Sequence, residues 1–97
     1  MHVRLSSGAE AEFADAVRRY EAESQGLGAE YSIAIDQAMG KIVNHPLRWP
    51  NGRAGTRRIL VDRFPYIIYY QVRVREIFIV AVMHTSRRSG YWQKRVT

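Results

Sequence analysis

The sequence predicts an α+β fold in which a helical hairpin packs on one face of a small, largely antiparallel sheet. Residues 64–72 and 77–83 are rich in aromatic and β-branched side chains, and only residues 73–76 separate them, which indicates a β-hairpin. In the first half of the chain, two consecutive stretches carry apolar residues at helical spacing, and two consecutive helices can cover only one face of a sheet. The predicted order is strand, helix, helix, strand, strand, strand (β-α-α-β-β-β), in a single domain over residues 1–97.

A short strand and a helix start open the chain. Residues 2–5 alternate polar and apolar side chains, which predicts a strand with Val3 and Leu5 directed inward. Ser7 and Glu10 have the spacing of a capping box, in which a serine hydroxyl and a glutamate carboxylate satisfy the amide donors left free at a helix start. We therefore expect the first helix to begin at Ser7.

Two amphipathic helices are predicted between residues 7 and 44. Their apolar stripes consist of Phe13, Ala16, Val17 and Tyr20 in the first helix and of Tyr31, Ile35, Ala38, Met39 and Ile42 in the second. On the polar side of the first helix, Arg19 has i,i+4 partners in Asp15 and Glu23. Pro46 ends the second helix, because proline disfavours helix in the residue before it. A loop at residues 45–56 then leads to a strand at residues 57–62 with a basic start.

The last predicted strand is apolar at every position from residue 77 to residue 83, so both of its faces need apolar contacts. Its two alternating sets are Ile77, Ile79, Ala81 and Met83 on one face and Phe78, Val80 and Val82 on the other. The helices cover one side only, and the second apolar face would be bare on a free monomer, which indicates a partner. An extended acidic segment of another protein would fit there, and homodimerisation through the same face is the alternative.

The composition limits the possible functions. Lys and Arg number 15 against 9 Asp and Glu, and the resulting net charge of +6 suits nucleic acid, a membrane surface or an acidic protein segment. Cysteine is absent, which excludes disulfides, a thiol nucleophile and cysteine-based zinc sites, and three scattered histidines do not form a metal site. No apolar run approaches the ~20 residues that span a bilayer, so we expect a cytoplasmic protein that uses no cofactor.

Basic and aromatic residues near the end of the chain are the best candidates for a functional site. Arg87, Arg88, Tyr91 and Trp92 could contact a target or a partner, or they could close as a cap over the sheet. No glycine-rich phosphate loop and no set of Ser, His and Asp residues in a plausible order is visible.

Two further candidates have a structural alternative. His84 follows the last strand and is either a hydrogen-bonded strand-end residue or a group that moves a proton. Arg57 and Arg58 begin a strand and are either functional or solvated charges. The tyrosines at positions 66, 69 and 70 favour packing across the hairpin over base stacking.

Several motifs along the chain are specific in combination. They are Phe64-Pro65-Tyr66-x-Ile68-x-Tyr70, Ala81-Val82-Met83-His84, Arg87-Arg88-x-Gly90-Tyr91-Trp92, and the opening set Ser7, Glu10, Ala11, Glu12 and Phe13. Together they cover essentially the whole chain and resemble the RelE/ParE superfamily of type II toxin-antitoxin toxins. The resemblance implies a small basic protein that halts growth unless an antitoxin from the same operon wraps it.

The two branches of this superfamily differ in chemistry. The resemblance implies that nuclease members cut mRNA in the ribosome with arginines that bind phosphate, one of them directly after the aromatic residue that matches Tyr66. This chain has Ile67 there, and an aliphatic side chain cannot stabilise charge that develops on a phosphate. Trp92 stands near the position of the nuclease tyrosine and has no ionisable group. The sequence therefore favours the ParE-like branch, which the resemblance implies poisons DNA gyrase.

Three hypotheses follow from the resemblance: a gyrase poison, a metal-independent and ribosome-dependent endoribonuclease, and a non-toxic binding module that joins its antitoxin in repressing their operon. The antitoxin would have a DNA-binding N-terminal domain, so operator DNA would be contacted only through it. The residues expected to bind the target are Arg57, Arg58, His84, Arg87, Arg88, Tyr91 and Trp92. Those expected to bind the antitoxin are Tyr69, Phe78, Val80 and Val82. A nuclease would use Arg87, Arg88, Tyr91 and His84.

Overall fold

The computed structural model describes residues 1–88 and 90–96, and its elements follow the predicted order. The strands and helices are β1 (His2–Leu5), α1 (Ser7–Glu23), α2 (Leu27–Asn44), β2 (Arg57–Leu60), β3 (Tyr66–Val72) and β4 (Glu76–His84). Two short 3-10 helices lie at Arg53–Gly55, between α2 and β2, and at Gln93–Val96.

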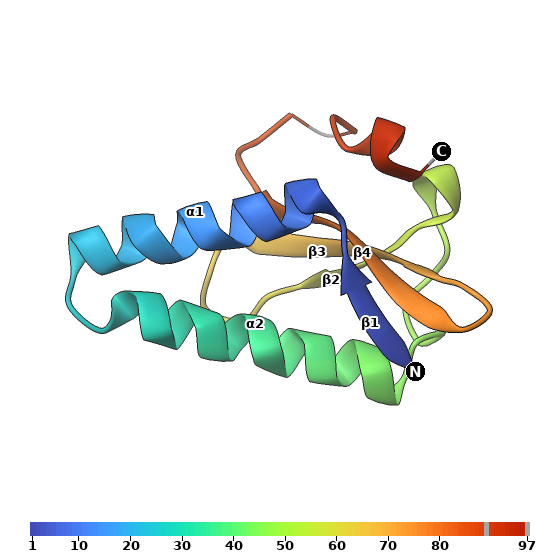
Figure 1. Ribbon diagram of the computed structural model, residues 1–97, viewed down its shortest axis with the longest axis horizontal. Coiled ribbons are helices and arrows are strands. Elements are labelled where there is room, and N and C mark those ends of the chain that lie inside the picture. Colours follow the sequence, from blue (N-terminus) through green and yellow to red (C-terminus); the bar gives the residue numbers. More distant parts are fainter. Residues whose placement is uncertain (89, 97) are drawn as a thin grey trace.

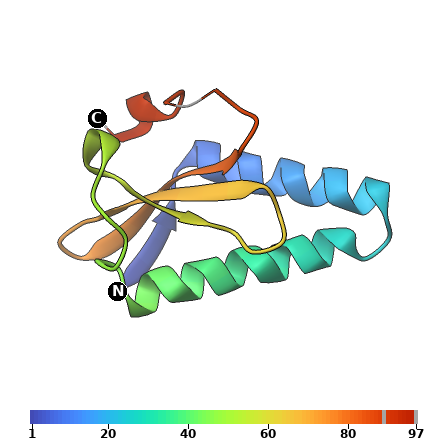
Figure 2. The same cartoon turned by 180° about the vertical axis from the view of Figure 1, so that it is seen from behind.

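The four strands form one sheet in the order β1-β4-β3-β2. β1 pairs in parallel with β4, whereas β2 with β3 and β3 with β4 pair antiparallel. The two helices lie side by side as an antiparallel hairpin (Figure 1). Seen from the front and from behind, the segment that ends the chain lies next to the first turns of α1 (Figures 1 and 2). The predicted fold class is confirmed.

α1 begins at Ser7 as predicted, but its capping residue differs from the prediction by one position. Ser6, not Ser7, is the N-cap: its hydroxyl accepts a hydrogen bond from the Ala9 amide (3.0 Å) and donates one to the Val80 carbonyl (2.8 Å). Ser6 is buried where α1 meets β4, whereas Ser7 is exposed. The S-x-x-E spacing cannot reveal which of two neighbouring serines is buried, and the buried one satisfies both backbone groups.

The polar side of α1 also differs from the prediction. Arg18, not Arg19, pairs with Asp15. Arg19 instead reaches across to the hydroxyl of Tyr66 on β3 and donates a hydrogen bond to it (2.7 Å). The ring of Tyr66 is buried, so its hydroxyl requires a polar partner, and Arg19 provides one.

Aromatic rings fill the core between the helices and the sheet. Tyr31 of α2 is fully buried, and its ring centroid lies 5.2 Å from that of Tyr20, 5.3 Å from that of Phe64 and 5.0 Å from that of Tyr66. Two of these three pairs are edge-to-face, an arrangement that aromatic rings prefer. The predicted stripes of both helices face this core, which confirms the helical periodicity.

A β-bulge interrupts the alternation of β4. The register shifts between two neighbouring pairs, Tyr69 with Ala81 and Tyr70 with Ile79. Val80 is therefore an extra residue in β4, and the side chains that follow it change faces. Val82 packs in the core beneath the helices, whereas Phe78 and Val80 pack on the opposite face. The prediction that these three residues share one face was wrong for Val82.

The sheet face opposite the helices is covered by the chain itself. Residues 91–96, which we term the C-terminal cap, place three side chains against this face, namely Tyr91, Trp92 and Val96. Trp92 is 1% exposed, and its ring centroid lies 4.5 Å from that of Tyr69. The prediction of a bare apolar face was therefore wrong, and the alternative of a cap that closes over the sheet is correct.

This cap also corrects the predicted antitoxin-binding set. Tyr69, Phe78, Val80 and Val82 are all buried within the chain. The first three lie beneath the C-terminal cap and the fourth beneath the helices. Phe78, Val80 and Val82 are not available to a partner while the cap is closed, whereas Tyr69 keeps 6% of its surface exposed beside β2.

Candidate functional site

The predicted site residues lie on separate surfaces. Arg57, Arg58 and Trp92 line a pocket beside β2, which is an edge strand of the sheet. Arg87 and Tyr91 instead contact Glu12 of α1. The basic and aromatic residues that the sequence suggested as a single site are therefore divided between two places.

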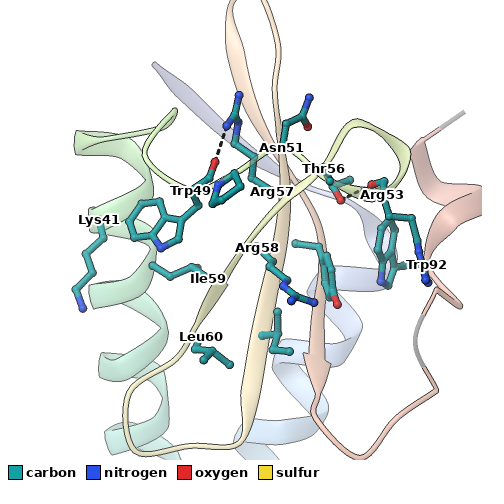
Figure 3. A pocket seen from close by; sticks show the side chains of 14 residues that line it. Lys41, Trp49, Asn51, Arg53, Thr56, Arg57, Arg58, Ile59, Leu60 and Trp92 are labelled. Atoms are coloured by element: carbon teal, nitrogen blue, oxygen red, sulfur yellow. Dashed lines mark hydrogen bonds between the residues drawn. The ribbon is translucent and has the colours of Figure 1, made fainter.

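The pocket has a volume of about 870 Å³ and lies between the loop at residues 45–56, β2 and the C-terminal cap (Figure 3). Arg58 and Leu60 of β2 pair with Tyr69 and Ile67 of β3, and all four side chains line the pocket. Leu60 is 68% exposed. Among the described residues that line the pocket there is no carboxylate, and four are basic: Lys41, Arg53, Arg57 and Arg58. Such a surface suits a partner segment that is acidic and partly apolar.

Arg57 anchors the loop that forms one wall of this pocket. Its guanidinium donates hydrogen bonds to the carbonyl oxygens of Leu47 (3.5 Å) and Trp49, as Figure 3 shows for Trp49. The hydroxyl of Tyr70 donates to the Pro46 carbonyl (2.9 Å) and fixes the start of the same loop. Arg57 therefore has a structural role, and Arg58 is the exposed member of the predicted pair.

Glu12 receives hydrogen bonds from three side chains near the end of the chain and from the backbone of β4. Its Oε2 accepts from Arg87 Nη1 (3.1 Å), Arg95 Nη2 (3.2 Å) and the Tyr91 hydroxyl. Its Oε1 accepts from Arg95 Nη1 (3.0 Å) and the Val82 amide (3.0 Å). The Glu12 side chain is only 13% exposed. We term Glu12, the three side chains and this amide the Glu12 cluster.

The lengths of the strands explain why this cluster forms. β1 ends at Leu5, whereas β4 continues to residue 84, so the outer edge of β4 loses its strand partner. Ser6 and Arg95 both donate to the Val80 carbonyl, at 2.8 and 3.1 Å, and Glu12 accepts from the next outward amide. Side chains thus satisfy backbone groups that a longer β1 would have paired.

The Glu12 cluster leaves its members poorly suited to catalysis. Burial, together with the hydrogen bond to Glu12 and the charge of Glu12, raises the pKa of Tyr91. Its hydroxyl therefore stays protonated at neutral pH and is not available as a general base. The guanidinium of Arg87 lies 3.7 Å from the centroid of the Tyr91 ring and is paired with Glu12, so part of its charge is already neutralised.

His84 and Arg88 complete the predicted set. His84 Nδ1 accepts a hydrogen bond from the Ser86 amide (3.0 Å), and its ring lies edge-on to Tyr66 with the centroids 5.1 Å apart. This arrangement matches the hydrogen-bonded strand-end alternative. Arg88 is exposed, and the structure gives it no ion pair with any other residue in the ranges 1–88 and 90–96.

Glu12 and Arg95 were not among the residues predicted from the sequence to form a site. One signal for Glu12 was present, because it follows Ala9 by three residues and precedes Ala16 by four, and both alanines are fully buried. A carboxylate in line with buried residues requires a partner. Arg95 carries no comparable signal, because the tail has no periodic pattern.

The described residues contain neither a metal-binding group nor a membrane-spanning helix. No group of three or more His, Asp or Glu side chains in residues 1–88 and 90–96 is arranged to hold a metal ion. Over the same residues, neither helix is long and apolar enough to cross a membrane.

Comparisons with known proteins relate this chain to one sequence family and to one solved fold. A family model described as the ParE toxin of the type II toxin-antitoxin system parDE matches residues 3–89. A solved structure described as "Chromosomal ParDE TA system from P. aeruginosa" is similar, with a TM-score of 0.64 and 15% sequence identity over 89% of this chain and 97% of that chain. At this identity the likeness concerns the fold alone. Comparison with curated proteins finds no match.

Proposed function

Because this chain belongs to the ParE toxin family of type II toxin-antitoxin systems, we propose that it inhibits growth by poisoning DNA gyrase and that a cognate antitoxin neutralises it. The choice of gyrase rests on one observation: of the groups that a nuclease would need, the strand arginine is replaced by Ile67, and Arg87, Tyr91 and His84 are engaged within the chain, whereas Arg88 is exposed. The action would take place in the cytoplasm, where gyrase and the antitoxin are found.

Ile67 supports the choice of gyrase. Its side chain lines the pocket opposite Leu60, on the sheet face away from the helices. The resemblance places an arginine at this position in nuclease members. An isoleucine at this position cannot itself stabilise the charge that develops during cleavage of a phosphodiester.

The tail supports the same choice. A nuclease would draw on Arg87, Arg88, Tyr91 and His84. Of these, Arg87 and Tyr91 are held by Glu12, and His84 accepts hydrogen bonds at the end of its strand. A ribosome-dependent endoribonuclease is therefore the alternative, and a co-repressor without toxicity is the third hypothesis.

The antitoxin would contact the pocket beside β2. Of the four residues that the sequence suggested, Tyr69 lines this pocket and the other three do not, while Arg58 and Leu60 beside it are exposed. The basic lining and the net charge of +6 favour an acidic segment with apolar side chains. The antitoxin would carry the DNA-binding domain through which the complex reaches its operator.

The exposed cations are the side chains that we expect to contact the target. Arg58 projects into the pocket, and Arg88 lies in the segment between β4 and the C-terminal cap. Changing both to alanine should weaken growth inhibition and leave the thermal stability unchanged, because both side chains are solvated. A matched control is the double variant Arg18→Ala/Arg75→Ala, which removes the same charge from α1 and from the turn before β4.

The first experiment measures whether DNA synthesis or protein synthesis stops first. The chain is induced alone in host cells, and incorporation of labelled thymidine and of labelled amino acids is followed over minutes. Inhibition of gyrase should stop thymidine incorporation first, and the Arg18→Ala/Arg75→Ala control should behave as the unchanged chain does.

The other outcomes identify the alternatives. If amino-acid incorporation stops first, the target is the ribosome and the gyrase proposal is wrong. If neither changes while the folded protein accumulates, the chain is a binding module that acts only with its antitoxin.

A further inference from the structure

The Glu12 cluster has the donor set of a site for an oxyanion. Two guanidinium groups, one phenol hydroxyl and one main-chain amide converge on the two oxygens of a single carboxylate. The guanidinium and amide donors lie 3.0–3.2 Å from those oxygens. Arginines and backbone amides are the groups with which proteins commonly bind phosphate.

The donors come from separate parts of the chain, and all of them meet at this one anion. Val82 belongs to β4, Arg87 follows that strand, and Tyr91 and Arg95 belong to the C-terminal cap. Arg95 and Glu12 are 83 residues apart in the sequence. The positive groups would repel one another without a negative charge between them.

The first turn of α1 leaves room for one of these donors. A Cβ atom at Gly8 would lie 2.3 Å from the Cζ of Arg95, which is closer than non-bonded atoms approach. Because residue 8 has no side chain, the guanidinium of Arg95 can lie against the helix and reach both oxygens of Glu12. The site is thus shaped by the backbone as well as by charge.

We propose that Arg87, Tyr91, Arg95 and the Val82 amide form a phosphate-type anion site that Glu12 occupies from within. The carboxylate holds the C-terminal cap closed and keeps phosphate groups out of the site. Arg87 and Arg95 are then unavailable to nucleic acid in the folded chain, whereas Arg88 stays exposed. This inference does not depend on which target the toxin has.

Removing the carboxylate should open the site to an external anion. In Glu12→Ala, the vacated space lies among donors that have lost their partner, so inorganic phosphate should bind roughly tenfold or more tightly than it binds the unchanged chain. Calorimetric titration with inorganic phosphate at constant ionic strength measures this. A second arm, with a labelled single-stranded oligonucleotide, distinguishes free phosphate from the phosphates of a nucleic-acid backbone.

Two variants control for charge and for shape. Glu10→Ala removes the same charge from an exposed position one half-turn away and should gain no phosphate binding. Glu12→Gln removes the charge but leaves the space filled, so it should bind phosphate no better than the unchanged chain. The double variant Glu12→Ala/Arg87→Ala should lose the gain, because one of the two guanidinium groups is gone.

The possible results are decisive in both directions. If the Glu12→Ala substitution destabilises the fold, phosphate should raise the melting temperature of this variant more than it raises that of Glu10→Ala. A ligand that binds only the folded state stabilises the folded state. The proposal is overturned if Glu12→Ala and Glu10→Ala bind phosphate equally, or if Glu12→Ala is unfolded and phosphate does not restore its fold.

Discussion

Trp92 is the residue on which the C-terminal cap depends. It is the largest fully buried side chain in the described part of the molecule, and it lies against Tyr69 on the sheet face away from the helices. Its Nε1 has no hydrogen-bond partner among the described residues. Trp92 therefore holds the cap by packing, whereas Glu12 holds it by charge and hydrogen bonds.

Substitutions at position 92 should separate packing from hydrogen bonding. Trp92→Ala should lower the free energy of unfolding by about 3–5 kcal/mol, because it removes a large buried ring. Trp92→Phe should cost much less, because an aromatic ring remains and a buried donor without a partner is removed. Urea denaturation followed by circular dichroism measures both, with the half-buried Trp49→Ala as a control. Equal losses in the two position-92 variants would contradict the packing role.

Individual residues were predictable where a repeat revealed them. The stripes of α1 and α2 were correct because each position repeats one environment. Ser6, Glu12 and Arg95 were not predictable in their roles, because each acts through a partner at least 70 residues away in the sequence. Local spacing contains no information about such distant pairs.

At the scale of elements, the junction of β1 and α1 joins three parts of the fold. One hydroxyl, that of Ser6, caps α1 and bonds to the backbone of β4 beyond the point where β1 ends. The amide of the same residue donates to the Ile79 carbonyl (2.9 Å). The short strand therefore passes into the helix without leaving these groups unpaired.

Substituting the two neighbouring serines should show which one caps the helix. Ser6→Ala should lower the free energy of unfolding by about 1–2 kcal/mol, because it removes the acceptor for the Ala9 amide. Ser7→Ala should change it by less than about 0.5 kcal/mol, because Ser7 is exposed. Thermal unfolding followed by circular dichroism compares them. A larger loss at Ser7 would restore the capping box that the sequence motif suggested.

The order of the elements was predictable, whereas the bulge in β4 and the packing of the C-terminal cap on the sheet were not. Runs of aromatic and β-branched residues predicted β3 and β4. Dividing the side chains of β4 between two faces assumed unbroken pairing, and the bulge at Val80 breaks it. The covered second face was missed for a different reason. A tryptophan in an aperiodic tail does not indicate which surface it will cover.

For the whole molecule, the burial of tyrosines determines how stability changes at alkaline pH. Burial raises the pKa values of Tyr20, Tyr31, Tyr66, Tyr70 and Tyr91 above the ordinary value of 10.0. A folded chain therefore keeps protons that the unfolded chain loses above about pH 10. The resulting stability is fully present below pH 10 and is lost as the pH rises beyond it.

Tyr31 offers a direct test of this alkaline limit. Its hydroxyl is buried and has no hydrogen-bond partner among the described residues, so Tyr31→Phe should leave stability at pH 7 unchanged or slightly higher. Above pH 10 the variant should lose stability less steeply, by about 1.4 kcal/mol per pH unit, because one fewer group titrates in the unfolded chain. Urea midpoints between pH 7 and 11 measure this. An unchanged slope would show that Tyr31 ionises equally in both states.

The parallel pairing of β1 with β4 also sets the order of events during synthesis. Ser6 and Val80 are 74 residues apart, and contacts of such high sequence separation slow folding. The helical hairpin of α1 and α2 needs only local contacts and can form while later residues are still being added. Its apolar stripes then stay uncovered until the strands of the sheet, ending with β4, have been made. A nascent chain is thus exposed to proteases and chaperones until its last strand has been made.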